Sequence, residues 1–439
     1  MATANEKKNK NSHEQYLDII TYNKNSLNNL RRAVVLGQGQ FSLILARVNY
    51  RRLQRVLLIE LGVHLRFQKV VIPADATNLR DVMEAADKDA GDPLAGDNSD
   101  AQPQALMISG LEDVSHGSNF ADDWPESLSQ DAASTAKKAT VSLEQLLKTA
   151  NLGRDELPKR FPYPIVLWVN DTVLQHLNRY APDLKSFSAT PIRFEYPAPS
   201  LIAVLRKQAA DTFTQILDRD KGIVLSTHLP LSESIVEPLA ARELTFAIAQ
   251  LEQLPDAQAD LVTNSLLADL LFLQGRSLHQ QGELVRARSY YEKSLVHWQL
   301  EAADQPMNAR RLTAAKSGSV KKAYLLHSRD KQAVLRFHLG LWWRTYATLG
   351  ATEQESTAAY QQARAYFESC LTIFRQQNRS DRVARFILAL ADVVQKLEDW
   401  PALIEVAKEG TRLHSNDPAR LARDYGYLAE ASLAYHQEA

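Results

Sequence analysis

The chain has 439 residues, 45% of them hydrophobic, and this length predicts more than one domain. Its 51 Lys and Arg residues nearly balance 52 Asp and Glu residues, so net charge does not steer the whole molecule toward nucleic acid or an anionic membrane. The single cysteine, Cys370, excludes an internal disulfide and any zinc site built from two or more thiolates.

The first part of the chain begins with a polar segment, residues 1–25, that lacks the apolar core of a signal peptide. No run along the sequence reaches the roughly 20 apolar residues of a membrane span. We therefore expect a soluble cytoplasmic protein that does not bind membranes.

Five short apolar runs predict β-strands between residues 26 and 199. Each run is too short for a helix, and its continuous hydrophobicity is typical of a strand covered on both faces. Amphipathic segments between the runs predict helices, and Ser142 is expected to begin one of them. The alternation predicts an α/β domain with a parallel sheet. The runs are 41–49, 67–73, 104–111, 164–170 and 190–197.

Acidic residues are concentrated around the third predicted strand. Residues 81–135 contain 13 Asp and Glu residues against one Lys. The segments 86–103 and 115–140 are also rich in Gly, Pro, Asp and Ser, which is typical of solvated loops. We expect a buried strand held between two acidic loops.

From residue 200 the helical period dominates. We interpret 200–260 as a helical linker domain and 261–439 as an α-solenoid of tetratricopeptide (TPR) type. One unit has small or aromatic residues at the template positions Gly275, Ala287, Tyr291 and Ser294. A second unit repeats the pattern, and a third is weaker; the second has Gly340, Ala363, Phe367 and Cys370.

Three phrases in the first half, GQFSLILARVNY, QALMISGLEDV and FPYPIVLWVNDTVLQHLNRYAPDLKSF, followed by TPR units, resemble cyanobacterial STAND-type NTPases. The resemblance covers essentially the whole chain and points to a branch whose P-loop is degenerate. It implies a P-loop NTPase-like α/β core, coupled to a helical sensor array, in a signal-transduction or defence protein.

A working P-loop requires G-x-x-x-x-G-K-[ST] after the first strand, because its backbone amides and lysine hold the phosphates. At that junction this sequence reads Ala-Arg-Val-Asn-Tyr-Arg over residues 46–51, without glycine or a Gly-Lys pair. Arg47 and Arg51 are candidate anion-binding residues, and solvated helix residues are the alternative interpretation. We expect no bound cofactor, with ATP and magnesium as the alternative.

Two other strand ends carry polar residues that a nucleotide site would use. Glu112 and Asp113 follow the third strand at the Walker B position, where a carboxylate would face magnesium, or they are acids at the edge of a loop. Asn170 and Asp171 follow the fourth strand, where Asn170 would sense a γ-phosphate or cap the next helix.

The helical half carries a basic segment, 306–345, interpreted as an insert in the array. It has nine Lys and Arg residues and one acid, Asp330. Trp342 and Trp343 are adjacent, so on a helix they diverge by about 100° and should not share a face. The candidate partner-binding residues are Arg310, Arg311, Lys321, Lys322, Arg336 and Trp343.

These observations lead to a non-enzymatic, STAND-like regulatory or scaffold protein that binds a protein partner through its TPR groove. A second copy of the chain is a further possible partner. Two alternatives stay open: a nucleotide-binding switch with a non-standard ATP site, and a nucleic-acid sensor that uses the basic segment. No catalytic residue or metal ligand is predicted, since the 11 histidines form no HExxH pattern.

Overall fold

A computed structural model describes residues 16–73, 75–89, 104–114, 142–217, 241–255, 258, 260–312, 318–349 and 352–438. Of these, residues 87–89, 241, 301–327 and 436–438 are described by their backbone alone. The chain divides into two compact units, Met1–Ser200 and Leu201–Ala439.

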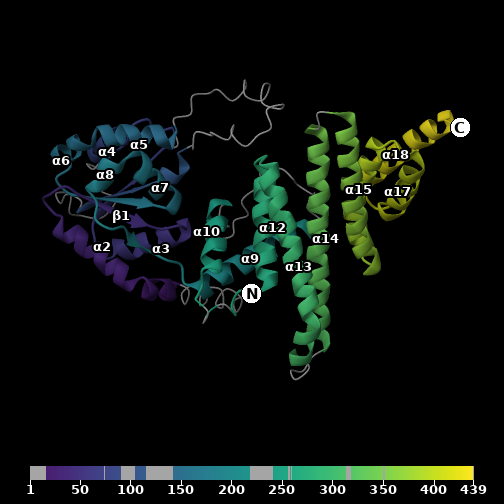
Figure 1. Cartoon of the computed structure of the whole chain (residues 1–439), viewed down its shortest axis with the longest axis horizontal. Helices are drawn as coiled ribbons and strands as arrows, with labels where there is room; N and C mark the ends of the chain where they lie inside the picture. The colour runs from purple at the N-terminus through teal and green to yellow at the C-terminus, as the bar shows by residue number, and fades with distance from the viewer. Residues whose placement is uncertain are drawn as a thin grey trace. The chain divides into compact units, whose positions relative to one another are not determined.

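The first unit is built on a parallel five-stranded sheet (Figure 1), and all five strands fall within the predicted apolar runs. The order across the sheet is β2-β3-β4-β1-β5. Arg47, the last residue of β1, lies beside Val169, the last residue of β4. The strands are β1 (Ser42–Arg47), β2 (Phe67–Val71), β3 (Ala105–Ser109), β4 (Pro164–Val169) and β5 (Ile192–Arg193).

Helices cover both faces of this sheet. The connection from β1 to β2 runs across the sheet in the opposite direction to the others, so a right-handed crossover places α3 on the opposite face. Figure 1 shows α2 and α3 on one side and α4, α5, α6 and α8 on the other. The helices are α2 (Lys24–Leu36), α3 (Arg51–Gly62), α4 (Leu79–Asp89), η1 (Leu111–Asp113), α5 (Leu143–Leu152), η4 (Arg154–Glu156), α6 (Leu157–Arg160), α7 (Asp171–Tyr180) and α8 (Pro182–Ser186).

Local signals place several of these helices as predicted. Ser142 begins α5 with a capping box, in which its hydroxyl accepts from the Gln145 amide and the Gln145 side chain accepts from the Ser142 amide. Of the predicted acidic loops, residues 86–89 instead form the end of α4, since Ala, Lys and Asp can continue its helical turn. Residues 90–103 and 115–141 lie outside the described part of the chain.

The predicted polar segment 1–25 joins the α/β unit from Tyr16 onward. Ile19 is buried, and the Asn23 amide group binds the backbone of Glu195, just beyond β5. In that contact Nδ2 donates to the carbonyl oxygen and Oδ1 accepts from the amide, each at 2.9 Å. Sequence composition alone did not show this contact, because a polar segment can still contribute single buried residues.

The second unit is helical throughout its described residues. Successive helices pack as hairpins, α12 with α13, α14 with α15 and α16 with α17, and α18 then packs on α17 (Figure 1). The bounds are α9 (Ala198–Leu217), α10 (Ala241–Glu252), α12 (Asn264–Gln280), α13 (Leu284–Leu312), α14 (Gly318–Leu349), α15 (Glu353–Gln376), α16 (Ser380–Lys396), α17 (Trp400–Leu413) and α18 (Pro418–Glu438).

The small residues of the predicted units lie where paired helices cross. A Cβ atom placed on Gly275 would stand 2.8 Å from the ring of Tyr291, and one on Gly340 would stand 2.6 Å from the ring of Phe367. Cys370 is completely buried beside these contacts, and burial raises the pKa of its thiol well above the usual range. The thiol therefore packs as a small apolar group.

The described part of the predicted insert 306–345 is helical. Residues 306–312 continue α13 to its end at Leu312, and residues 318–345 belong to α14, so the segment lengthens the facing helices of two neighbouring hairpins. Ala, Arg, Leu and Lys in the segment favour helix, and α13 continues through Pro306.

Replacing Gly340 with Ala is expected to lower the free energy of unfolding by about 1–3 kcal/mol, because the added methyl group overpacks the Phe367 ring. Helix propensity alone predicts the opposite sign, a gain of roughly 0.5–1 kcal/mol. Urea unfolding monitored by circular dichroism measures the difference. Gly426→Ala on α18 is the matched control, because nothing lies within 4 Å of its Cβ position, and it should stabilise.

Candidate functional site

The carboxyl ends of the parallel strands bring the predicted nucleotide-site residues together. Arg47 ends β1, Asp171 begins the helix after β4, and Glu112 and Asp113 form η1 after β3. The chain leaves β1 and β4 toward opposite faces, and ligands of open α/β sheets bind in the crevice at such a switch point. This edge is the candidate site.

Asp171 lies at this switch point, as the first residue of α7. Its two carboxylate oxygens accept from the Arg47 guanidinium, through Nε at Oδ1 and through Nη2 at Oδ2 over 2.6 Å. Asn49 completes the contact, since its Nδ2 donates to Oδ2 of Asp171 at 2.9 Å and its Oδ1 accepts from the Asp171 amide at 3.0 Å. Burial raises the pKa of Asp171, but the hydrogen bonds from Arg47 and Asn49 outweigh it and leave the pKa below its usual value.

Arg51 is likewise engaged by carboxylates. Its Nη2 donates to Oδ1 of Asp113, and its Nε lies 3.9 Å from Oε1 of Glu112. Burial raises the pKa of Glu112, since the Arg51 charge only partly offsets the loss of water. Both candidate anion-binding arginines are thus neutralised by acids of this chain.

Asn170 caps a helix. Its Oδ1 accepts from the backbone amide of Val173 at 2.8 Å and begins α7. The sequence analysis mentioned Asp171 only together with Asn170, and it did not identify Asn49 as a site residue. The available signal was an Asn in the turn after β1 and an Asp in the turn after β4, on two strands that prove to be neighbours.

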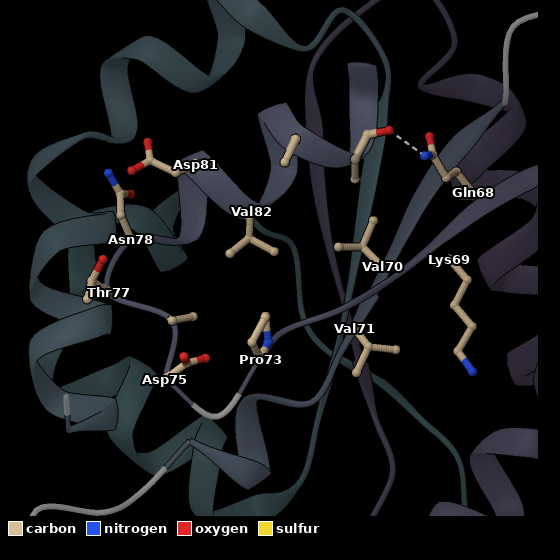
Figure 2. Close-up of a pocket in the computed structure, with 13 residues that line it drawn as sticks. Gln68, Lys69, Val70, Val71, Pro73, Asp75, Thr77, Asn78, Asp81 and Val82 are labelled. Atoms are coloured by element: carbon tan, nitrogen blue, oxygen red, sulfur yellow. Dashed lines mark hydrogen bonds between the residues drawn. The ribbon is translucent and has the colours of Figure 1, made fainter. Parts of the chain in front are cut away.

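A shallow pocket of about 630 Å³ lies at the far edge of the sheet, between β2 and α4 (Figure 2). Figure 2 shows Val70, Val71 and Val82 around its centre, with Asp81 on one side and Lys69 on the other. The Gln68 side chain closes one end by donating from Nε2 to the Ala86 carbonyl at 2.5 Å. Strands β3 and β4 separate this pocket from Arg47, so the two sites are distinct.

The predicted partner-binding residues of the helical unit fall into two groups. Arg310 and Arg311 lie on α13 and Lys321 and Lys322 on α14, where only the backbone is described. Arg336 is half-buried on α14, donates from Nη1 to the Gln332 carbonyl at 3.3 Å, and has its pKa lowered by burial.

The two tryptophans share a contact that helix geometry alone did not predict. Trp342 is buried, and its Nε1 donates to the Leu284 carbonyl at 2.7 Å. The Arg288 guanidinium of α13 lies 5.3 Å from the Trp342 ring centroid and 4.7 Å from that of Trp343. One long side chain from the preceding helix therefore contacts both indoles, although they leave α14 in different directions.

The last turn of α9, within the predicted linker, packs on three helices of the array. Phe213 stacks on Phe272 of α12, with ring centroids 4.8 Å apart. Lys331 of α14 lies 5.0 Å from the Phe213 ring centroid. Arg385 of α16 is buried and donates from Nε to the Ile216 carbonyl at 2.6 Å.

No protein-family model matches the chain, and no curated protein is significantly similar to it. Within the described ranges, no helix is long and apolar enough to cross a membrane. Nor does any group of three or more His, Cys, Asp or Glu side chains in those ranges converge as a metal site would require.

Proposed function

We propose that the chain is a non-enzymatic, STAND-like regulatory or scaffold protein, in which a degenerate nucleotide-binding core is joined to a TPR-type array that binds a protein partner. One observation carries the proposal. At the switch point of the sheet, where a nucleotide would bind, the guanidinium of Arg47 is held by Asp171 of the same chain, and Asn49 in turn donates to that carboxylate. A phosphate group would have to displace a carboxylate that already accepts hydrogen bonds from Nε and Nη2 of Arg47.

The sheet itself supports the resemblance to STAND proteins. It is a parallel sheet with helices on both faces, and its order changes direction at β1, as expected for an open nucleotide-binding α/β core. The phosphate-binding elements do not fit that role, because β1 leads into α3 without glycine and α3 begins with Arg51 and Arg52. We therefore assign no step to ATP or magnesium.

The helical hairpins support the binding role. Gly275 and Gly340 let paired helices approach at an aromatic ring, the crossing expected of TPR units. Stacked units of this kind expose the inner helices as a surface for a protein ligand.

Calorimetric titration of magnesium-ATP and magnesium-ADP is expected to give no binding heat and no thermal shift. The titration is sensitive, because a ligand at 100 times its dissociation constant would add about 2.7 kcal/mol of stability. A magnesium-dependent ATPase activity that Glu112→Gln abolishes would contradict the proposal and favour a nucleotide switch. Asp171→Asn serves as a second probe: if anion binding appears only after this change, Asp171 is what excludes phosphate.

A further inference from the structure

Strand β2 forms one edge of the parallel sheet, and among the described strands only β3 pairs with it. Along a strand, the backbone groups of successive residues face opposite neighbours. The Ile72 amide donates to the Ser109 carbonyl at 2.8 Å, so the even-numbered residues of this segment face β3. The backbone N–H and C=O groups that face outward, with no hydrogen-bond partner among the described residues, are those of Phe67, Lys69 and Val71.

A groove accompanies this open edge on the side of α4. It is the pocket of about 630 Å³ described above, and its helical wall is apolar, formed by Val82, Ala85 and Ala86. Figure 2 shows Val82 across from Val70 of β2, which is only 5% exposed and forms part of the floor. An extended segment lying here would pair its backbone with β2 and bury every second side chain against α4.

Lys69 sets the charge that this edge accepts. It is the middle residue of β2, its side chain is exposed, and it forms no ion pair with any described residue. If β2 of a second copy paired antiparallel along the whole strand, Lys69 would lie directly opposite the same lysine of that copy. Like charges at opposite positions destabilise a strand pair, and edge lysines are a common device against such self-association. An acidic residue at the opposite position would stabilise the pair instead.

We propose that the open edge of β2 is a docking site for an extended segment of a partner protein, which adds to the sheet as a further strand. The segment carries Asp or Glu opposite Lys69 and apolar residues at the alternate positions that face α4. Opposite Phe67 and Val71, β-branched residues fit best, because Val71 is 56% exposed and offers apolar surface. This site belongs to the α/β unit and is additional to the partner binding proposed for the helical unit.

The probe is a fluorescein-labelled, C-terminally amidated peptide, Ser-Thr-Val-Glu-Val-Thr-Ser, whose glutamate takes the place opposite Lys69. Fluorescence anisotropy compares it with a peptide that has lysine instead of glutamate. We expect the glutamate peptide to bind the unaltered protein about tenfold more tightly, and Lys69→Glu to reverse that preference. Lys207→Glu is the matched control, since this exposed lysine of α9 undergoes the same change of charge and should leave the preference as it is.

A second variant tests the groove itself. Ala85→Arg introduces a long side chain at an exposed position of the helical wall, so it should abolish binding of the glutamate peptide. Arginine is a good helix former, and the Tm should change by less than about 2 °C. Ala358→Arg on α15 is the control, because it makes the same change at an exposed helix position outside the groove and should keep the binding intact.

Amide hydrogen exchange measured by NMR locates the contact on the strand. In the free protein, the amides of Phe67, Lys69 and Val71 should exchange faster than those of Gln68 and Val70, which face β3. The glutamate peptide should slow exchange of the outward-facing amides and leave the other two unchanged. A peptide held only by side chains would not produce this alternation.

The docking site would be overturned by absence of glutamate-peptide binding or by equal binding of the two peptides. Slow exchange of all the β2 amides in the free protein would also overturn it, because the chain would then cover its own edge. A dimer in analytical ultracentrifugation that Ala85→Arg dissociates would assign the edge to a second copy instead. The nucleotide titration at the other end of the sheet order tests the proposed function independently of these results.

Discussion

Replacing Lys331 with Met is expected to lower the free energy of unfolding by about 3–5 kcal/mol, because it leaves the Asp269 carboxylate buried without its partner. Lys331 Nζ lies 2.5 Å from Oδ2 of Asp269, and the two residues are only 8% and 6% exposed. The Trp298 ring, with its centroid 5.5 Å from Nζ, closes the site on another side. Oδ1 of Asp269 receives no hydrogen bond from any described residue.

The deficit of this variant should depend on pH. Burial raises the pKa of Asp269 to about 6, although Lys331 lowers it, so removal of Lys331 raises it further. An acid with a raised folded-state pKa contributes stability that is present at low pH and lost as the pH rises through that pKa. We therefore expect the deficit to be largest above pH 7 and to shrink toward pH 5.

Denaturant unfolding at pH 7.5 and pH 5 measures both effects. The double variant Lys331→Met with Asp269→Leu should recover most of the loss, since an apolar pair of similar volume often equals a buried ion pair. A deficit below about 1 kcal/mol, or one that is the same at both pH values, would contradict this account.

Replacing His414 with Ala is expected to lower the free energy of unfolding by about 3 kcal/mol or more. The imidazole is 2% exposed and lies between two acceptors, with Nδ1 2.6 Å from Oδ2 of Asp424 and Nε2 2.6 Å from the Ala384 carbonyl oxygen. A neutral imidazole has only one N–H group and cannot donate to both acceptors. A second proton is therefore needed, held by the imidazole or shared with the Asp424 carboxyl group. Burial is the main cause that raises the pKa of Asp424, and His414 opposes it.

Without His414, Asp424 is buried with only the weaker influence of the Arg423 charge to lower its pKa, so its pKa should rise further. The variant should therefore gain stability as the pH falls from 8 to 5 more steeply than the unaltered protein does. Denaturant unfolding across this range tests the slope. His64→Ala is the control, since this exposed histidine lies 3.7 Å from Glu60 and should change stability by less than about 1 kcal/mol.

The parallel sheet could be predicted because a buried strand is visible in the sequence as a short continuous run of apolar residues. In β4 all six residues are buried, and the continuous run Pro-Ile-Val-Leu-Trp-Val carries that information locally. The residues at which paired helices cross could also be predicted from local sequence, because the spacing from Ala363 to Phe367 lies within one helix.

The pairing of charges could not be predicted in this way. Arg47 and Asp171 are separated by 124 residues, and only the neighbouring positions of β1 and β4 bring them together. The length of α13 was missed because Pro306 was interpreted as a boundary.

The position of α9 has a consequence for how the helical unit unfolds. In a linear array each hairpin contacts only its neighbours, so stability is nearly a sum of adjacent terms and the ends unravel first. The last turn of α9 contacts Phe272 of α12 and Arg385 of α16, which belong to hairpins that are not adjacent along the chain. The last turn of α9 therefore couples two hairpins that are separated along the chain. Opening α16 must release α9, so hydrogen exchange should show α12 and α16 opening together as one cooperative unit, with α18 fraying separately.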